Sequence, residues 1–326
     1  MSSTLDNRII REQILALPEM ATWPEVDILF PEEGPVRKLD WLLPGIGARA
    51  VGGRMEDTHP AMAALACTQI NIILVDDMLD QEPEGAHVTM GPGRTANLAL
   101  ALQAAAHLLM DRCPVPASRR AAATQALARM SLATAAGQEL DVRNLQGEEA
   151  YWAVVQAKST PFYGAGLEIG ALLGGASAQV SQALYRVGQL LGEAIQVFDD
   201  LEDAFQAPAN SDWAQGRNNL VLLYALTADY PEKERFLALR ARAEADPDSL
   251  AAAQEILVRC GALAYCAYQL GVRHRRIHDL LAELALPHPE ALEDLLASQL
   301  RPFLTFLERL APSLAEQFMA MAGVPS

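Results

Sequence analysis

Two short acidic segments carry the residues of this sequence that could do chemistry, Asp76-Asp77-Met78-Leu79-Asp80 and Asp199-Asp200-Leu201-Glu202-Asp203. Both follow the pattern Asp-Asp-x-x-Asp. Residues four apart lie on one face of an α-helix, so the first and last aspartates of each segment would stack together. Carboxylates held that close repel each other, and hard divalent cations with oxygen ligands are the counterions that best balance them.

Magnesium is the cation that this pattern favours. It usually keeps several waters and binds through one or two carboxylates together with the phosphates of a substrate. Two facing aspartate segments would therefore hold magnesium bridged to a diphosphate. One such segment alone could simply be a solvated helix end, but two copies, each at the end of a long apolar run, favour the metal site.

Helices must position these segments, because apolar residues recur at helical spacing almost throughout the chain. Ile70, Ile73 and Leu74 precede the first segment with that spacing, and the run from Leu184 to Phe198 precedes the second. Strictly alternating stretches, which would indicate strands, are scarce. The stretch from Met62 to Asp76 is apolar around much of its circumference, which is typical of a central helix in a large bundle. The sequence predicts an all-α fold.

Turn-forming residues mark where the helices should be connected. They interrupt the helical pattern at Gly52-Gly53, Pro83 to Gly93, Cys113 to Pro116, Gly174-Gly175 and Asp246 to Asp248. No repeat of fixed period and no low-complexity segment divides the chain. We therefore expect residues 1–326 to form a single domain.

The charge balance argues against one class of partner. Lysine and arginine total 25 against 41 aspartates and glutamates, a net charge of -16, so no positive field would gather nucleic acid. Residues 1–30 contain neither a signal-peptide core nor an Arg-rich presequence. Apolar runs such as Leu98 to Met110 fall short of a membrane span. We expect a cytoplasmic protein without stable membrane insertion.

Further short motifs accompany the two aspartate segments, and they occur in the order Arg37-Lys38, Ala48 to Gly53, Gly137 to Asp141, Lys158-Ser159, Gln196 and Gly216-Arg217. Together they resemble the trans-isoprenyl diphosphate synthase (polyprenyl synthetase) family, whose members join allylic prenyl diphosphates to isopentenyl diphosphate. The resemblance covers residues 34–225. It implies a single large helical bundle of the isoprenoid synthase (class I terpenoid synthase) type and a homodimer.

The resemblance also implies a role for each matching residue. The ligands of three magnesium ions would be Asp76, Asp80 and Asp199, with Asp77, Asp200 and Asp203 as secondary or water-mediated ligands. The residues that contact the allylic diphosphate would be Lys158, Ser159 and Arg217, and Gln196 would lie near the carbon that becomes cationic. The cations left for a second diphosphate would be Arg37, Lys38 and Arg94.

The sequence departs from the family pattern where that second diphosphate would bind. After Asp80 the family normally has Arg-Arg-Gly, whereas this chain continues with Gln81 to His87 and has no basic pair. Asp40 stands where the second arginine of the basic N-terminal motif is usual, and Gln69 stands where a histidine of the isopentenyl diphosphate pocket is expected. Losing these cations removes most of the attraction for a diphosphate, because charge-assisted hydrogen bonds dominate such sites.

These departures favour a divergent isoprenyl diphosphate synthase-like terpene synthase. Such an enzyme would still ionise an allylic prenyl diphosphate but would capture the cation internally or with water. In the family, bulky aromatics four or five residues before the first aspartate limit the chain length. Ile72 and Asn71 occupy those positions here, which fits a C15 or C20 substrate.

Two other functions stay open. In the first, the chain is an ordinary chain-elongating trans-prenyltransferase that makes farnesyl, geranylgeranyl or polyprenyl diphosphate. Its rearranged second site would then use Arg37, Lys38, His87 and Arg94. In the second, the chain is a non-catalytic partner subunit, but such a subunit would have little reason to keep two intact aspartate segments.

Overall fold

The computed structural model describes residues 7–31, 39–210, 212–213 and 218–322, and these residues form helices and turns without strands. The predicted all-α architecture is therefore confirmed. The helices are, in chain order, α1 (Asn7–Leu15), η1 (Met20–Thr22), α2 (Glu25–Leu29), η2 (Leu39–Leu42), α3 (Leu43–Ala50), η3 (Glu56–Thr58), α4 (His59–Asp80), α5 (Ala86–Met90), α6 (Pro92–Asp111), α7 (Ala117–Val142), α8 (Glu148–Val154), η4 (Val155–Ser159), α9 (Thr160–Gly174), α10 (Ala178–Phe205), α12 (Leu220–Thr227), α13 (Lys233–Arg240), α14 (Pro247–Arg259), α15 (Ala262–Glu283), α16 (Glu290–Leu310) and α17 (Pro312–Ala322).

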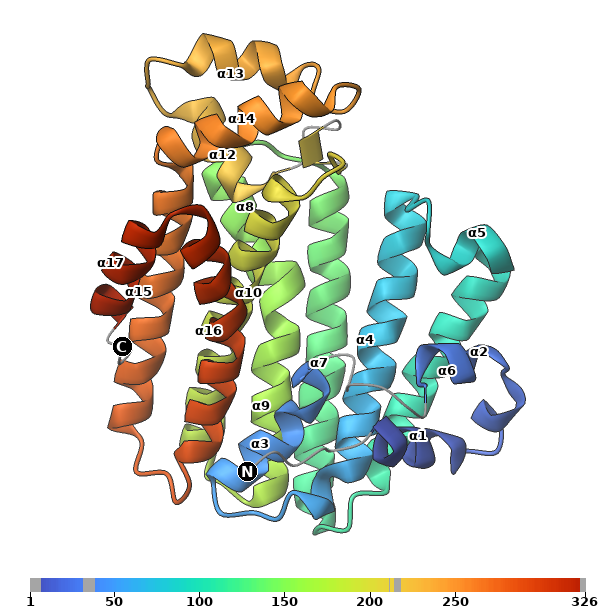
Figure 1. Ribbon diagram of the computed structural model, residues 1–326. Helices are drawn as coiled ribbons and strands as arrows, with labels where there is room; N and C mark the ends of the chain where they lie inside the picture. The colour runs from blue at the N-terminus through green and yellow to red at the C-terminus, as the bar shows by residue number, and fades with distance from the viewer. Residues whose placement is uncertain (1–6, 32–38, 211, 214–217, 323–326) are drawn as a thin grey trace.

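The long helices form the body of a bundle (Figure 1). Helix α10 packs against α9 and α15, while α7 packs against α9 and α4. Helices α12, α13 and α14 lie across the upper end of the bundle in Figure 1, and α1 and α6 cover α4 on the opposite side from α10. The two aspartate segments belong to the C-terminal ends of α4 and α10, at the same upper end of the bundle.

Two clusters of buried apolar side chains stabilise the bundle, and α10 belongs to both. Leu184 and Leu191 of α10 join the cluster that contains the buried side chains of α4, α6, α7 and α9. Val197 and Leu201, further along the same helix, join the cluster built by α12, α14, α15 and α17. A continuous helix shared by two cores ties them together. We therefore propose that the chain is one domain, as the sequence predicts.

Helix α4 is buried along most of its length because nearly every residue from Pro60 to Ile70 is apolar. It ends at Asp80 because Gln81 adopts a left-handed conformation with φ 56°, which stops the helical hydrogen bonding. The aspartates therefore occur where α4 leaves the core.

Glycine allows η4 and α7 to approach closely. A Cβ atom added to Gly137 of α7 would lie 2.3 Å from the backbone carbonyl carbon of Ala157 in η4, so any larger residue would push the two elements apart. Since η4 is a single π-helical turn that contains Lys158, this close approach sets the position of that lysine beside α7.

Most predicted connections fall between helices. Gly52-Gly53 follows α3, Cys113 to Pro116 separates α6 from α7, and Gly174-Gly175 ends α9. The stretch from Pro83 to Gly93 differs, because it contains the short helix α5.

One helical stretch of the described residues, Glu56–Asp80, is long and apolar enough to cross a membrane by length and composition, and the bent pair α14 and α15 passes the same test when taken together. The bundle buries 56% of the most apolar window of Glu56–Asp80. A central helix of a large bundle has this composition because it is surrounded by other helices.

Candidate active site

The first aspartate segment occupies the last turns of α4, where Asp76, Asp77 and Asp80 are all partly exposed. Burial raises the pKa of Asp77, and repulsion from Asp76 and Glu82 raises it further. The C-terminus of a helix is the negative end of its dipole, so three carboxylates there are unfavourable without a cation.

Asp76 is held by two side chains from neighbouring elements. Lys158 Nζ of η4 lies 3.0 Å from Asp76 Oδ1 and 2.6 Å from Asp141 Oδ2 of α7. Gln138 Nε2, also of α7, donates a hydrogen bond to the same Asp76 oxygen. Burial by itself would lower the pKa of Lys158, but the two carboxylates outweigh burial and raise that pKa. A charged ammonium group therefore lies against the first aspartate segment.

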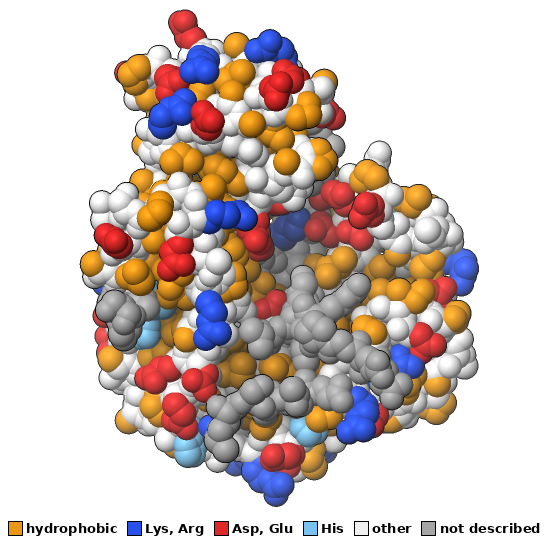
Figure 2. All heavy atoms as spheres, viewed as in Figure 1, with side chains coloured by type: hydrophobic (Ala, Val, Ile, Leu, Met, Phe, Trp, Pro, Cys, Tyr) orange, Lys and Arg blue, Asp and Glu red, His pale blue; other side chains and the backbone are white. Residues whose placement is uncertain are grey.

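The second aspartate segment lies at the C-terminal end of α10. Burial raises the pKa of Asp203 to about 6, with further repulsion from Asp212 and from Glu82, which lies just beyond Gln81 at the end of the first segment. The two segments thus lie close enough to interact. Figure 2 shows acidic side chains gathered around the mouth of a hollow at this end of the molecule, with basic side chains beside them.

Asp200 is set apart from its neighbours by burial, with only 4% of its surface exposed. Its Oδ2 accepts a hydrogen bond of 2.8 Å from the backbone nitrogen of Leu220, and its Oδ1 accepts one of 3.0 Å from Gln196 Nε2. Burial raises the pKa of Asp200 to about 7. These contacts tie Asp200 to the start of α12, and its role as a secondary metal ligand stays a prediction.

The described residues that the sequence predicts to contact the substrate lie together around Gln196. Ser159 Oγ donates a hydrogen bond of 2.8 Å to Gln196 Oε1. Both residues, together with Lys158 and Asp199, line a cavity of about 140 Å³ between α4, α9 and α10.

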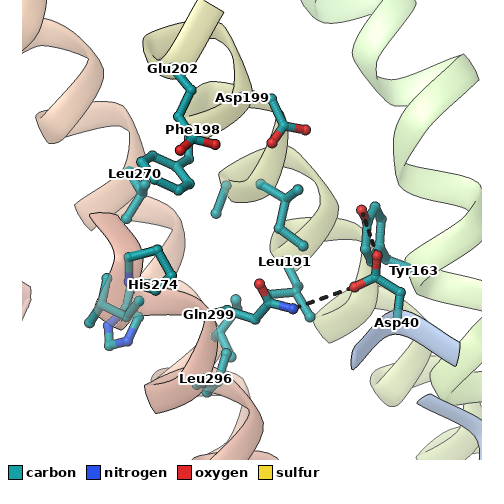
Figure 3. Close-up of a pocket in the computed structure, with 15 residues that line it drawn as sticks. Asp40, Tyr163, Leu191, Phe198, Asp199, Glu202, Leu270, His274, Leu296 and Gln299 are labelled. Atoms are coloured by element: carbon teal, nitrogen blue, oxygen red, sulfur yellow. Dashed lines mark hydrogen bonds between the residues drawn. The ribbon is translucent and has the colours of Figure 1, made fainter. Parts of the chain in front are cut away.

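A second cavity of about 460 Å³ lies on the other side of α10, against α15 and α16 (Figure 3). Asp199 lines both cavities. Most other side chains around the larger cavity are apolar, among them Leu191, Phe198 and Leu270. Its volume falls in the range of roughly 300–1,000 Å³ that is usual for small-molecule sites.

The donor set fits magnesium. Within the described ranges, no three carboxylate, imidazole or thiol groups converge closely enough to hold a metal ion by themselves. Magnesium does not need such a cage, because it keeps waters and takes one or two carboxylates together with phosphate oxygens. Asp76 and Asp80 on α4 and Asp199 on α10 are hard oxygen donors of this kind, and Lys158 lies beside them.

Of the basic residues expected for a second diphosphate, Arg94 and His87 lie among the described residues, and Arg94 is held elsewhere. Arg94 Nη2 lies 2.8 Å from Glu25 Oε1 of α2, so an acidic residue away from both aspartate segments holds it. His87 lies near the first segment, where its charge acts to lower the pKa of Asp77 against the stronger opposing effects. Three other predicted contacts lie outside the described residues, namely Arg37, Lys38 and Arg217.

Asp40 and Gln69, where the sequence departs from the family pattern, belong to one hydrogen-bond network. Gln69 Nε2 donates to Asp40 Oδ2 at 3.5 Å and Gln69 Oε1 accepts from Trp41 Nε1 at 2.6 Å. Gln299 Nε2 of α16 donates to Asp40 Oδ1 at 3.4 Å, and Tyr163 OH of α9 donates to Oδ2 at 3.5 Å (Figure 3). Sequence reasoning placed Gln138 in the motif Gly137 to Asp141 but gave it no role of its own. It missed Gln299, which carries no signal that distinguishes it from a surface glutamine.

The chain is similar to one family model. The model described as polyprenyl synthetase matches residues 45–257. Among curated proteins, a geranylgeranyl diphosphate synthase from Methanosarcina mazei is 27% identical over 235 residues, which cover 68% of this chain and 71% of that protein.

Solved structures share the fold. Geranylgeranyl pyrophosphate synthetase from Pyrococcus horikoshii has a TM-score of 0.75 at 20% identity, covering 89% of this chain and 93% of that one. Polyprenyl synthase from Caulobacter crescentus, solved with calcium and isoprenyl diphosphate, has a TM-score of 0.72 at 25% identity, covering 89% of this chain and 91% of that one. These likenesses agree with the bundle type predicted from the sequence.

Proposed function

The chain belongs to the polyprenyl synthetase family, and from that premise we propose that it is a magnesium-dependent trans-prenyltransferase that joins an allylic prenyl diphosphate to isopentenyl diphosphate. Membership confirms the resemblance drawn from the motifs and the prediction that the protein is an enzyme. The choice between the two predicted reactions changes: the names of the relatives favour chain elongation over the terpene synthase activity that the sequence alone favoured.

The observation that carries this proposal is the arrangement around Asp199. This carboxylate lines both cavities and lies on the helix that faces Asp76 across the hollow, where Lys158 adds a positive charge. A diphosphate at this place would have a cation on one side and apolar walls for its hydrocarbon on the other. Ionisation of an allylic diphosphate needs both, because the leaving group gains charge while the carbon fragment must be kept from water.

Asp76, Asp80 and Asp199 would hold the magnesium, and bound magnesium would stabilise the charge that develops on the departing diphosphate. Lys158 would exchange its contact with Asp76 for a hydrogen bond to a diphosphate oxygen. Gln196, which Ser159 orients, would lie against the reacting end of the allylic chain. Apolar side chains of α10, α15 and α16 would exclude water from the cation.

The second diphosphate would depend on Arg37 and Lys38, which the sequence offers at the N-terminal basic motif. The terpene synthase reaction is the second candidate, and two observations favour it. Arg94 is paired with Glu25, and Asp40 is buried where the family has a cation. Both features reduce the positive charge available to a second diphosphate, and neither changes the residues proposed for the allylic diphosphate.

We propose a C20 product, because the relatives include geranylgeranyl diphosphate synthases. Below the first aspartate segment, Asn71 Nδ2 donates a hydrogen bond of 2.8 Å to Gln103 Oε1, and Gln103 Nε2 donates one of 3.3 Å to Ser131 Oγ. The structure thus supplies the helix-to-helix partner that a buried amide needs. A polar bridge of this kind would limit how far an apolar chain extends beneath Asp76.

We further propose a cytoplasmic homodimer. Leu100 and Leu108 of α6 and Leu132 of α7 expose 68%, 56% and 73% of their surfaces. Large leucines exposed on adjacent helices support a face that a second copy covers. Sedimentation of the purified protein tests this part of the proposal, and a monomer with unchanged activity would contradict it.

The decisive experiment separates the two reactions. Purified protein is incubated with geranyl, farnesyl or geranylgeranyl diphosphate and magnesium, with and without isopentenyl diphosphate, and both products and released diphosphate are measured. We expect a longer prenyl diphosphate only when isopentenyl diphosphate is present. A hydrocarbon or alcohol formed from the allylic substrate alone, with no elongated product, would replace this proposal with the terpene synthase reaction.

A further inference from the structure

A mostly buried ion pair joins α10 to α15 beside the turn η4. Arg273 Nε lies 2.6 Å from Glu193 Oε2, and the two side chains expose only 12% and 13% of their surfaces. Such a pair adds little net stability, because removing both charges from water offsets their attraction. Apolar side chains of similar size would hold the two helices together as well, but they would not orient the hydrogen-bonding groups around them. The ion pair is therefore suited to fixing positions.

Arg273 also contacts α8, the helix that leads directly into η4. Its guanidinium carbon lies 3.9 Å from the centroid of the Trp152 ring, where a cation is attracted to the face of the indole. Its Nη1 donates hydrogen bonds of 2.7 Å and 3.0 Å to the side-chain and backbone oxygens of Gln269, one turn earlier on α15. These contacts fix the guanidinium group in an orientation that faces both α8 and α10.

The Trp152 ring is held at its edge as well as on its face. Trp152 Nε1 donates a hydrogen bond of 3.2 Å to Glu148 Oε1, and Tyr265 OH of α15 donates to the same oxygen. Gln269 Nε2 donates one of 2.8 Å to Tyr265 OH, which closes a ring of contacts between α8 and α15. The end of α8 therefore cannot shift relative to α15 without breaking several polar contacts.

Glu193 extends these contacts from α10 to η4. While its Oε2 faces the arginine, its Oε1 accepts a hydrogen bond of 3.4 Å from Gln156 Nε2. Three residues further along α10, Gln196 Oε1 accepts one of 2.8 Å from Ser159 Oγ. Residues three apart share a helix face, so α10 contacts η4 both before and after Lys158 in the sequence.

The π-helical form of η4 decides where Lys158 points. Such turns are rare, and regular α-helical hydrogen bonding would rotate the residues of η4 relative to α8. On one side, the close approach at Gly137 fixes the backbone of η4 against α7. On the other side, α8 and α10 must stay in place for Lys158 Nζ to remain 3.0 Å from Asp76 Oδ1.

We propose that Arg273 is a positioning residue for η4: with Glu193, it holds α8 and α10 so that the ammonium group of Lys158 faces the diphosphate. This inference rests on the proposed function, in which Lys158 binds the allylic diphosphate. Arg273 is not among the residues that line the two cavities, so it acts through Lys158 and not on the substrate itself. Loss of Arg273 should therefore matter only while Lys158 is present.

A double-mutant cycle tests this coupling. The affinity for inorganic diphosphate with excess magnesium is measured by calorimetry for wild type, Arg273→Met, Lys158→Ala and the double variant. We expect Arg273→Met to weaken binding by about 10-fold in the wild-type background and by less than about 2-fold in the Lys158→Ala background. An equal loss in both backgrounds, or no loss in either, would overturn the proposal, because a purely structural contact does not depend on the lysine.

Arg275→Met is the matched control on the same helix. Arg275 Nη2 donates a hydrogen bond of 2.7 Å to the backbone oxygen of Met321 on α17, so this variant should bind diphosphate as wild type does. If Arg273→Met does not fold, Glu193→Gln takes its place in the cycle, since it removes the ion pair without changing the size of the side chain. We expect the same dependence on Lys158, and wild-type affinity of Glu193→Gln would refute the role of the ion pair.

The cycle measures binding and is therefore independent of the product assay. Coupling between Arg273 and Lys158 in a wild-type protein that elongates no allylic substrate would refute the proposed function alone. Elongation by the wild-type protein without that coupling would refute the positioning role alone.

Discussion

The two aspartate segments share one pattern but lie in different surroundings. At the end of α4 all three aspartates are partly exposed, and Asp76 is contacted by the side chains Lys158 and Gln138. At the end of α10 the middle aspartate, Asp200, is buried and accepts hydrogen bonds from Leu220 and Gln196. The spacing decides which carboxylates share a helix face, whereas the surroundings decide which of them can serve a metal and which hold the fold.

The largest effect should come from the outer aspartates of both segments. Asp76→Ala and Asp199→Ala should each lower magnesium-dependent diphosphate release by at least ~10³-fold, because each removes an oxygen donor where the leaving group gains charge. Their melting temperatures should stay close to wild type, since Asp76 is partly exposed. Near-normal turnover by either variant would mean that its carboxylate is not a metal ligand.

Substitution of the middle aspartate of each segment, Asp77 or Asp200, should change the unfolding free energy by different amounts. Asp200→Ala leaves the backbone nitrogen of Leu220 and the amide of Gln196 buried without their acceptor, and should cost about 3 kcal/mol of unfolding free energy. Asp77→Ala should leave stability unchanged or raise it, because it removes a carboxylate that Asp76 and Glu82 repel. Denaturant titrations at pH 6 measure both. Equal losses of unfolding free energy in the two variants would show that burial does not distinguish Asp200 from Asp77.

The pH dependence of stability should come from the second segment. Burial raises the pKa of Asp200 from 3.8 to about 7 and that of Asp203 to about 6. A carboxyl group whose pKa is higher in the folded state stabilises the fold fully below pH 3.8, and this contribution is lost as pH rises through 6 and 7. With magnesium chelated, unfolding free energy should therefore fall as pH rises from about 4 to about 7, by about 1.4 kcal/mol per pH unit for Asp200 and by less for the partly exposed Asp203.

Asp200→Asn is the matched variant for this titration. It keeps an oxygen acceptor in the same place but has no proton to lose, so its stability should change less over the same pH range. If the wild-type curve were as flat as that of the variant, Asp200 would be charged in the folded protein at neutral pH.

The helices and the location of the site could be predicted from local sequence. The apolar stretch from Met62 to Asp76 lies within α4, and Leu184 to Phe198 lies within α10, because helical periodicity depends on neighbouring residues alone. Both aspartate segments follow these runs directly, so their position at the ends of core helices followed from the pattern. The glycine pairs Gly52-Gly53 and Gly174-Gly175 located the ends of α3 and α9 for the same reason.

Roles that depend on distant contacts could not be predicted in this way. The sequence assigned Asp200 only a metal contact, because nothing nearby in sequence shows that its carboxylate also accepts a hydrogen bond from the backbone of Leu220. Asp40 was read only as a lost cation, while its partner Gln299 lies 259 residues away. Such contacts join α10 to α12 and η2 to α16, and the order of residues along the chain does not reveal them.

The smallest expected effect concerns Arg94, the basic residue nearest in sequence to the first aspartate segment on its C-terminal side. Its ion pair with Glu25 lies at the surface on the arginine side, with 64% of the Arg94 side chain accessible against 14% for Glu25, and pairs that solvent reaches contribute only about 0–1 kcal/mol. Arg94→Gln should therefore leave KM for isopentenyl diphosphate and melting temperature nearly unchanged, whereas Arg37→Gln should raise that KM if the N-terminal motif holds the second diphosphate. A large rise in KM with Arg94→Gln would show that this arginine leaves Glu25 when substrate binds. The first segment would then have a second cation beside Lys158. The two segments would differ not only in burial but also in the positive charge that they offer to a diphosphate.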